Sequence, residues 1–208
     1  MIAMPTVFVI DDDVSVREGL TNLLESADLR VCAFETADAF LAAETASGPA
    51  CLLLDVRLQE ASGFDVQQAL AARGQKIPII FMTGFGTIPM SVRAIKAGAV
   101  EFLTKPLDAE QMLAAVCAAL GNAAIHHRDG QREADWQRRH ASLTPREQEV
   151  MALAIGGLMN KQVAAELGTS EITAKVHKRR VMEKMGARSL ADLVRMAEKL
   201  NIEAQKNR

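Results

Sequence analysis

The stretch Cys51-Leu52-Leu53-Leu54-Asp55 decides the fold, because it is an apolar run about as long as one buried strand and it ends in a single carboxylate. A short apolar run bounded by loop-like sequence is typical of a central strand in a parallel sheet. In open parallel sheets, functional groups gather just beyond the carboxyl ends of the strands. The other groups that the chain brings near Asp55 therefore indicate its chemistry.

Strand-like and helix-like segments alternate on both sides of this stretch. Thr6–Ile10 is a β-branched and aromatic run, and Val14–Ala27 follows with helical apolar spacing. The later segments are strands at Arg30–Phe34, Cys51–Leu54, Pro78–Met82 and Val100–Leu103, and helices at Ala37–Glu44, Phe64–Ala72, Thr87–Ala97 and Asp108–Leu120. Five such units predict an α/β domain over residues 1–121, a doubly wound parallel sheet of order 2-1-3-4-5 with helices on both faces.

The predicted strand ends carry complementary chemical groups. Strand one ends at Asp11 and Asp12, strand three at Asp55, strand four at Thr83, and Lys105 follows strand five. Clustered carboxylates repel one another unless a cation neutralises them, and ligands of this kind suit Mg²⁺. Such an ion would bridge the carboxylates and an incoming phosphoryl group, which Asp55 attacks as the nucleophile. Lys105 supplies a fixed positive charge, and the Thr83 hydroxyl can donate to a phosphoryl oxygen.

The run Asp11-Asp12-Asp13 fits two other interpretations. The aspartates could cap the following helix, and Ser15 with Glu18 also fits a capping box. Asp11-Asp12-Asp13-Val14 also resembles the nucleophile motif of haloacid-dehalogenase-type phosphatases, which would make Asp11 the phosphorylated residue and Asp13 the acid–base. That enzyme hypothesis requires a further acidic pair after a later strand, where Thr104-Lys105-Pro106 stands instead.

The motifs VFVIDDD, LLLD, MTGFG and FLTKP resemble those of the receiver domain of two-component response regulators. The resemblance implies that a sensor histidine kinase phosphorylates Asp55. It also implies that Mg²⁺ is surrounded by Asp11, Asp12, Asp55 and the backbone carbonyl of Arg57. The same likeness makes the protein a regulator rather than an enzyme.

The receiver resemblance also assigns a switch. It implies that Thr83 and the aromatic Phe102 are the coupled switch residues, that Lys105 holds the phosphoryl group, and that Lys105-Pro106 is a cis peptide. Gln59 stands where the family usually has proline, so we expect a more mobile loop and an altered phosphoryl lifetime. A regulator whose receiver no longer responds to phosphate and binds DNA constitutively is the alternative.

Charge is distributed unevenly between the two halves of the chain. Residues 1–121 carry a net charge of −7, and residues 122–208 carry +5. This asymmetry indicates a cation site in the first half and nucleic acid for the second. Residues 122–142 lose apolar periodicity and are predicted to be a linker, partly helical, with a breaker signal at Asp129-Gly130. Trp136 is expected to anchor the linker on a domain surface, or alternatively to form a helix contact within a dimer.

The second half, residues 143–208, has the pattern of an all-α domain of four helices. The first helix opens at Thr144-Pro145-Arg146-Glu147, a capping box with proline at the first helical position. Asn160–Leu167 and Glu171–Met185, joined by a short turn at Gly168, give the helix-turn-helix signature. Leu190–Leu200 is the fourth helix.

The predicted helix Glu171–Met185 has two separable faces. One is an apolar stripe of Ala174, His177, Val181 and Met185. The other carries Lys175, Val176 and Arg179, whose cationic groups can donate to guanine or phosphate, while Val176 can touch a thymine methyl. A solvated basic face is the alternative interpretation.

The motifs LTPREQEV, GLMNKQVAAELG, TAKVHKRRVMEKM and RSLADLV resemble the DNA-binding domain of the FixJ/NarL/LuxR class. The resemblance implies that the third helix reads double-stranded promoter DNA and that the last helix contributes to dimerisation. The DNA-binding residues that it implies are Lys161, Thr173, Lys175, Val176, Lys178 and Arg179.

These features together predict a two-component transcriptional response regulator. Phosphorylation of Asp55 would alter the surface around Phe102, and the protein would form a homodimer, bind promoter DNA and regulate transcription, as an activator that engages RNA polymerase. No apolar stretch approaches the ~20 residues that a bilayer-spanning helix needs, and the start of the chain lacks a signal peptide, so we expect a cytoplasmic protein without a membrane partner.

The three cysteines, Cys32, Cys51 and Cys117, are expected to be buried free thiols.

Overall fold

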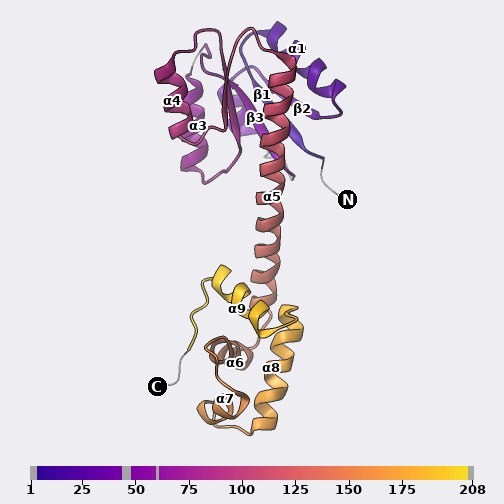
Figure 1. Ribbon diagram of the computed structural model, residues 1–208, viewed down its shortest axis with the longest axis vertical. Coiled ribbons are helices and arrows are strands. Elements are labelled where there is room, and N and C mark those ends of the chain that lie inside the picture. The colour runs from indigo at the N-terminus through magenta and orange to yellow at the C-terminus, as the bar shows by residue number, and fades with distance from the viewer. Residues whose placement is uncertain (1–3, 44–47, 60, 206–208) are drawn as a thin grey trace. The chain divides into compact units, whose positions relative to one another are not determined.

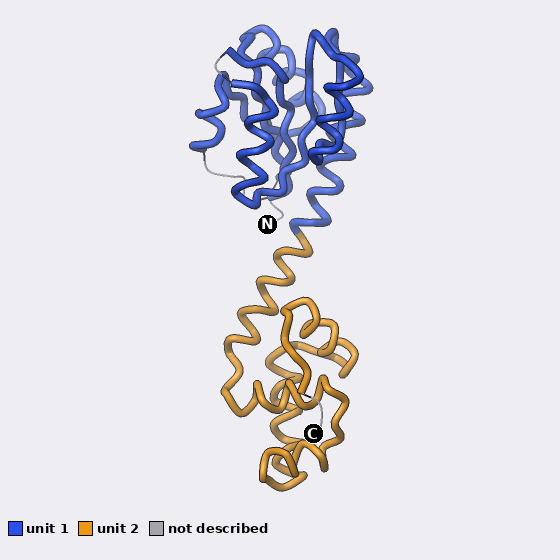
Figure 2. The backbone as a smooth tube through the Cα atoms, turned by 90° about the vertical axis from the view of Figure 1, so that its left-hand side faces the viewer, with its two compact units in different colours: residues 1–127 blue, residues 128–208 orange. Residues whose placement is uncertain are grey.

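The computed structural model describes residues 4–43, 48–59 and 61–205 of the chain. The chain divides into two compact units, residues 1–127 and residues 128–208 (Figure 2). The last residue of the predicted helix Ala37–Glu44 lies outside the described residues. Within the described ranges, none of the helices combines the length and apolar character that crossing a bilayer requires.

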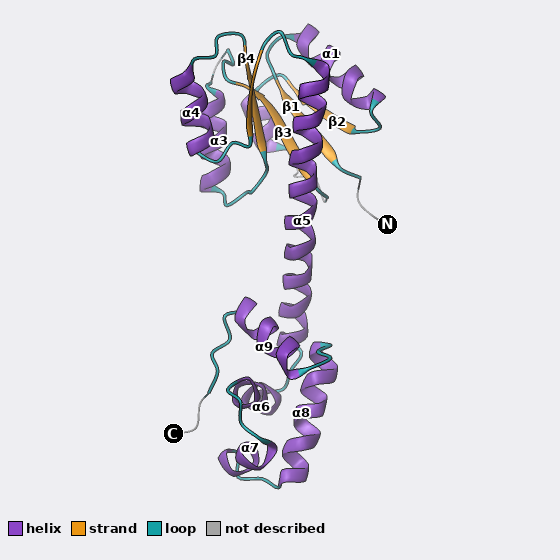
Figure 3. Cartoon of the chain, viewed as in Figure 1, coloured by secondary structure: helices purple, strands orange, loops and turns teal. Residues whose placement is uncertain are grey.

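Unit 1 contains a five-stranded parallel sheet of order β2-β1-β3-β4-β5, which confirms the predicted topology (Figure 3). The strands are β1 (Thr6–Ile10), β2 (Arg30–Phe34), β3 (Ala50–Asp55), β4 (Ile79–Thr83) and β5 (Glu101–Thr104). β3 pairs with β1 on one side and β4 on the other, with Leu54 beside Ile10 and Asp55 beside Met82. The stretch that ends in Asp55 is therefore the central strand, and its carboxyl end lies between those of β1 and β4.

Helices cover both faces of this sheet (Figure 1). The helices of unit 1 are α1 (Val14–Ser26), α2 (Ala37–Ala42), α3 (Gly63–Ala72), α4 (Ile88–Lys96) and the first part of α5 (Ala109–Ala141). Because side chains alternate along a strand, Val7 and Leu53 pack against α1 and α5, whereas Phe8 and Leu54 pack toward α2, α3 and α4. Both faces of the sheet are buried, which explains the unbroken apolar run of β3.

Helix α5 continues well beyond Leu120, the end predicted for it, and reaches Ala141. The signal at Asp129-Gly130 does not break it, since an internal glycine costs only about 1 kcal/mol relative to alanine. Arg132 pairs with Asp129 at 2.9 Å, and two further arginines pair with Asp135 at 2.6 and 3.0 Å, all at helical spacing. Trp136 packs against the core of unit 2, which favours the interpretation that it anchors the helix on that unit.

Unit 2 contains the four further helices that were predicted. They are α6 (Pro145–Ile155), α7 (Asn160–Glu166), α8 (Glu171–Met185) and α9 (Leu190–Lys199). The predicted capping box of Thr144 and Glu147 opens α6. Ala174, Val181 and Met185 of the predicted α8 stripe are buried in one core, while His177 is only half-buried. The opposite side of α8 is thereby turned to solvent.

The cysteine prediction is right for Cys51 and wrong for Cys117. Cys51 is buried on β3, Cys32 is half-buried and Cys117 is exposed on α5; all three are free thiols. Cys117 follows the buried Val116 by one residue, which on a helix is a rotation of about 100° away from the core. Burial raises the pKa of the Cys51 thiol to about 12, so that it stays protonated and unreactive.

A partly buried ion pair joins α6 to α8 in unit 2. The Glu147 carboxylate accepts hydrogen bonds from Lys184 Nζ at 2.6 Å and from the Thr144 backbone N–H at 2.8 Å. The Glu147 side chain is 4% exposed and that of Lys184 38%. The hydrogen bond from Lys184, followed by that from Thr144, lowers the pKa of Glu147 to about 2.

Glu147→Gln is expected to lower the free energy of unfolding of unit 2 by about 1–3 kcal/mol at pH 7. Because the folded pKa lies below the ordinary value of 4.5, this stabilisation is present above pH 4.5 and is lost as the pH falls toward about 2. Urea titrations followed by the fluorescence of Trp136, the single tryptophan, report on unit 2. Glu149→Gln, which breaks the exposed pair with Arg146, should change stability by less than about 0.5 kcal/mol. Equal effects of the two variants at pH 7, or a difference as large at pH 2 as at pH 7, would contradict this account.

Candidate functional site

Three carboxylates gather at the carboxyl end of β1 and β3. Asp11 and Asp12 directly follow β1, and Asp55 is the last residue of β3. One oxygen from each of the three lies within 4.8 Å of the others. Asp11 is 0% exposed and Asp55 7%. Three carboxylate oxygens this close form a donor set that suits a hard divalent cation, which would also relieve their mutual repulsion.

Lys105 joins two of these carboxylates from the end of β5. Its Nζ donates to Asp11 Oδ2 at 2.6 Å and to Asp55 Oδ2 at 2.5 Å. Burial acts to lower the pKa of Lys105, but its hydrogen bonds to Asp11 and Asp55 outweigh burial and raise the pKa above its ordinary value. Burial raises the pKa of Asp11, against the opposing hydrogen bonds from Lys105 and the Asp13 backbone N–H. The peptide before Pro106 is cis, as the receiver resemblance implies.

The second oxygen of Asp55 is held by the loop that follows β3. Asp55 Oδ1 accepts a hydrogen bond from the Arg57 backbone N–H at 2.8 Å. Asp55 therefore has one oxygen on a backbone amide and the other on an ammonium group, and its side chain has a fixed orientation. Arg57, whose carbonyl the resemblance assigns to the metal, lies in this same loop, immediately beside the carboxylates.

Thr83 ends β4 next to Asp55 and is 1% exposed. Its Oγ1 accepts a hydrogen bond from the Phe85 backbone N–H at 3.2 Å, which leaves the hydroxyl proton available for donation. The Phe85 ring in turn lies 4.7 Å from the guanidinium carbon of Arg57. This contact between two loops was not predicted, because their sequences carry no signal of which loop side chains meet.

The aspartates after β1 divide between two roles. Asp13 is exposed and is the N-cap of α1, where its side chain accepts from the Ser15 backbone N–H at 2.8 Å. The capping interpretation is therefore right for Asp13, and the proposed capping box of Ser15 and Glu18 is wrong. Arg17 donates to the backbone carbonyls of Asp11 and Asp12 at 2.8 and 2.9 Å, which fixes the turn that presents their carboxylates.

Gln59 lies beside the site rather than in it. It lines a cavity of about 290 Å³ together with Asp12, Leu58 and residues at the start of α2. The loop is closed by a hydrogen bond from the Leu58 N–H to the Ala61 carbonyl at 3.1 Å. The expectation that losing proline here alters loop mobility and phosphoryl lifetime stays a prediction.

Phe102 is half-buried on β5, which β4 separates from β3 and Asp55. Its ring centroid is 6.4 Å from that of Phe81 in β4. Gly86 lies between the two predicted switch residues: a Cβ at Gly86 would come within 3.1 Å of the Phe102 ring and 3.3 Å of the Thr83 methyl. The backbone at Gly86 therefore fills the space that links Thr83 to Phe102.

Gly86→Ala is expected to displace Phe102 and Thr104 and to destabilise unit 1 by about 1–3 kcal/mol, because the added methyl would lie 2.9 Å from the Thr104 methyl. Gly84→Ala is the matched control, since a Cβ there meets nothing within 4 Å. Urea denaturation followed by circular dichroism compares the two. Equal stability of both variants would show that the packing around Gly86 yields without cost.

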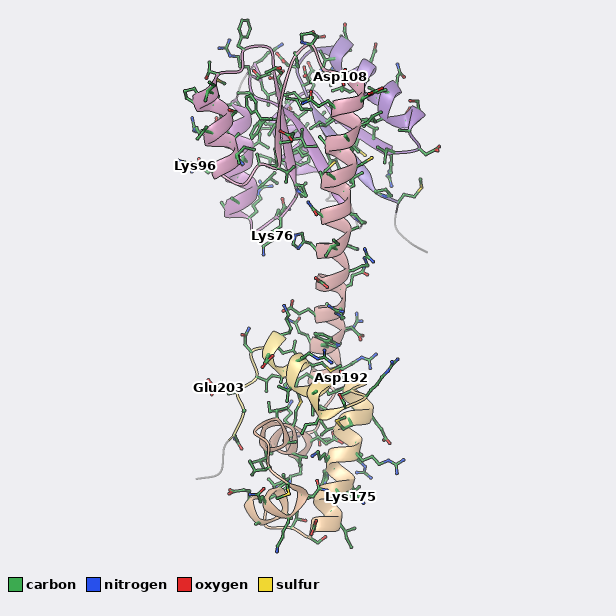
Figure 4. The ribbon with its side chains drawn as sticks, in the orientation of Figure 1. Lys76, Lys96, Asp108, Lys175, Asp192 and Glu203 are labelled. Atoms are coloured by element: carbon green, nitrogen blue, oxygen red, sulfur yellow. The ribbon has the colours of Figure 1, made fainter. Side chains whose placement is uncertain are left out.

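A second candidate site lies on the exposed side of α8. Lys175, Val176 and Arg179 are exposed there, Val176 by 44% of its surface. Figure 4 labels Lys175, whose side chain extends outward from α8. Arg179 Nε donates to Glu183 Oε1 at 2.7 Å, one helical turn further along. Both partners of this pair are exposed, so the guanidinium is accessible from solvent.

The other predicted DNA-binding residues are spread over α7 and α8. Lys161 is exposed in the first turn of α7, Thr173 is exposed in the first turn of α8, and Lys178 is half-buried. The Thr173 hydroxyl lies 2.8 Å from that of Ser170, the N-cap of α8. Ile172, which was not among the predicted residues, is 78% exposed on the same side of the helix as Lys175.

Comparison with known protein families covers both units. Residues 7–117 match the response regulator receiver domain, and residues 141–197 match the luxR family of bacterial regulatory proteins. The chain belongs to the response regulator family. It is a two-component response regulator, with a receiver domain followed by a LuxR-type DNA-binding domain that regulates transcription.

Relatives of this response regulator match almost its whole length. Nodulation protein W of Bradyrhizobium diazoefficiens is 52% identical over 198 residues, which cover 95% of this chain and 87% of the relative. The response regulator protein TodT of Pseudomonas putida is 45% identical over 194 residues, covering 93% and 86%. The transcriptional regulatory protein FixJ of Azorhizobium caulinodans is 44% identical, covering 92% and 90%.

Two solved structures align with almost the whole of this response regulator. The response regulator StyR aligns with a TM-score of 0.85 and 48% identity, over 95% of this chain and all of StyR. Full-length FixJ from B. japonicum aligns with a TM-score of 0.54 and 37% identity, over 95% and 97%. Both support the receiver fold and the helical second unit.

Proposed function

We propose that Asp55 is the residue on which this response regulator is phosphorylated, by a sensor histidine kinase. The observation that carries the proposal is the environment of the Asp55 carboxylate. It lies at the end of the central strand, where one oxygen accepts a hydrogen bond from the Arg57 N–H and the other accepts one from Lys105. Asp11 is also buried and also accepts a hydrogen bond from Lys105, and its carboxylate lies near that of Asp55 from the end of β1. Asp55 alone stands between the carboxylates of β1 and the hydroxyl of Thr83.

The carboxylates of Asp11, Asp12 and Asp55, with the Arg57 carbonyl, would hold Mg²⁺. Their oxygens are close enough to share one ion, and their hard oxygen chemistry matches its preference. When bound, Mg²⁺ supplies the charge neutralisation that a phosphoryl transfer transition state requires.

The phosphoryl transfer follows from the groups around Asp55. A carboxylate oxygen attacks the phosphorus of a phosphohistidine, a new O–P bond forms and the P–N bond breaks, and the imidazole of the kinase leaves with the electron pair. Lys105, held charged by its carboxylate neighbours, attracts a phosphoryl oxygen. The Thr83 hydroxyl donates its free proton to a second phosphoryl oxygen. This would move the Thr83 side chain, and the movement would reach the Phe102 ring through the close packing at Gly86.

The surface of α4 and β5 supports a homodimer as the product of this switch. Ile88, Val92 and Ile95 of α4 are 81%, 45% and 48% exposed, and their spacing puts them on one side of the helix. Val100, just before β5, adds a further side chain that is 42% exposed. An apolar stripe of this kind, next to Phe102, is suited to pairing with a second copy once the switch rearranges it.

Dimerisation would place two copies of α8 on adjacent half-sites of promoter DNA, where linked modules gain effective concentration. Lys175, Val176 and Arg179 would enter the major groove, with Thr173, Lys161 and Lys178 near the backbone. The regulator would act in the cytoplasm, as an activator that engages RNA polymerase from the promoter.

Incubation with Mg²⁺ and acetyl phosphate, followed by intact-mass spectrometry, tests the assignment. The unmutated protein should gain one phosphoryl group, and peptide mapping after borohydride trapping should place it at Asp55. Asp55→Asn should gain none. Labelling at Asp11 would support the phosphatase alternative, and no labelling together with DNA binding would support the regulator that works without phosphate.

A further inference from the structure

An isoleucine stands exposed at the N-terminal end of α8. Ile172 is 78% exposed and lies in the first turn, two residues after the N-cap Ser170. Single apolar residues on a surface are common and carry no meaning alone. The position of Ile172 on its helix is what makes the exposure informative.

Ile172 extends the exposed stripe of α8 by one turn. Ile172, Lys175, Val176 and Arg179 are spaced 0, 3, 4 and 7 residues apart, so that they share one side of the helix. Ile172 and Val176 are four apart and adjoin on the surface, and Lys175 lies beside both. The buried Ala174 and Val181 hold the opposite side against the core of unit 2. The exposed side is therefore a ridge in which apolar and cationic groups alternate.

The chemistry of Ile172 limits what it can recognise. It has no donor or acceptor, so it cannot bond to phosphates or to the polar edges of bases. In the major groove, the apolar group that a duplex presents is the C5-methyl of thymine, next to the guanine and adenine acceptors that cations contact. The first turn of the second helix in a helix-turn-helix lies nearest the base edges. The cations beside Ile172 complement the charge of the same duplex.

We propose that Ile172 is a specificity-determining residue that contacts a thymine methyl group in each half-site. The inference rests on the proposed function of α8 as the DNA-reading helix, and it adds a base preference of its own. It places the thymine next to the base pairs read by Lys175 and Val176.

Selection from a random-sequence duplex pool tests the proposal. The full-length protein, with Mg²⁺ and beryllofluoride, is compared with Ile172→Ala and with Ile125→Ala, which removes a 52% exposed side chain from α5. Ile172→Ala should lose one thymine preference per half-site and keep the others, and Ile125→Ala should keep them all. Thermal unfolding followed by Trp136 fluorescence verifies that unit 2 of each variant is intact.

Deoxyuridine then isolates the methyl group. Replacing the identified thymine by deoxyuridine should weaken binding of the unmutated protein about fourfold, the contribution of roughly one buried methyl group. The same replacement should not affect Ile172→Ala. An unchanged motif for Ile172→Ala, or equal losses for both proteins, would overturn the inference. A motif altered by Lys175→Ala but not by Ile172→Ala defeats this inference alone, whereas no motif for the unmutated protein defeats the proposed DNA reading as well.

Discussion

The double variant Lys175→Ala, Arg179→Ala is expected to bind a selected promoter duplex at least about thirtyfold more weakly than the unmutated protein. Each good bidentate contact to a base contributes about 1–3 kcal/mol of discrimination, and 1.4 kcal/mol corresponds to a tenfold change. Both side chains are exposed on one side of α8, where Arg179 also donates to Glu183. Fluorescence anisotropy on selected and scrambled duplexes, at several salt concentrations, measures the effect.

A charge-matched control separates base reading from general attraction to DNA. Arg138→Ala with Lys199→Ala removes the same charge from α5 and α9. This control should bind the selected and the scrambled duplex more weakly by the same factor, because it loses only salt-dependent attraction to the phosphates. If both double variants lose affinity equally on both duplexes, the basic side of α8 is a solvated surface and not a reading face.

Asp11→Asn with Asp12→Asn is expected to slow phosphorylation from acetyl phosphate about 100-fold or more and to abolish its dependence on Mg²⁺. Removing a residue that only hydrogen-bonds to a metal ligand already lowers metal affinity or activity 10- to 100-fold, and these carboxylates would be direct ligands. Both lie within 4.8 Å of an Asp55 oxygen. Intact-mass time courses across a Mg²⁺ titration measure the rate and the apparent affinity.

Asp13→Asn is the control for this pair of substitutions. It removes a carboxylate from the same turn, but Asp13 is the N-cap of α1, and asparagine caps a helix about as well. Its rate and Mg²⁺ dependence should match those of the unmutated protein. A similar loss in Asp13→Asn would mean that net charge, and not direct ligation, governs the site.

The sheet and the gathering of the carboxylates were predictable because each depends on local pattern and a general rule. Five strand–helix alternations fix the fold class, and parallel strands bring their carboxyl ends to one edge of a sheet. Asp11, Asp55 and Lys105 could therefore be brought together without any knowledge of tertiary contacts. The two sides of α8 followed from helical spacing in the same way.

Features that depend on tertiary packing were not predictable. α5 continues past Asp129-Gly130 and packs Trp136 against the core of unit 2, a contact that the local sequence around the turn signal does not reveal. The contact of Arg57 with Phe85 joins loops whose side-chain directions only the folded chain defines. The place of Ile172 on the exposed stripe was predictable, since it lies three residues before Lys175. Its 78% exposure, which makes it a candidate for DNA contact, was not.

Sedimentation velocity of the full-length protein with Mg²⁺, with and without beryllofluoride as an acyl-phosphate mimic, tests the central claim most directly. Asp55→Asn is the control. We predict a monomer without the mimic, a dimer with it, and no change in Asp55→Asn. The absence of any shift in the unmutated protein, or the same shift in Asp55→Asn, would contradict the claim that Asp55 is the switch and dimerisation its output.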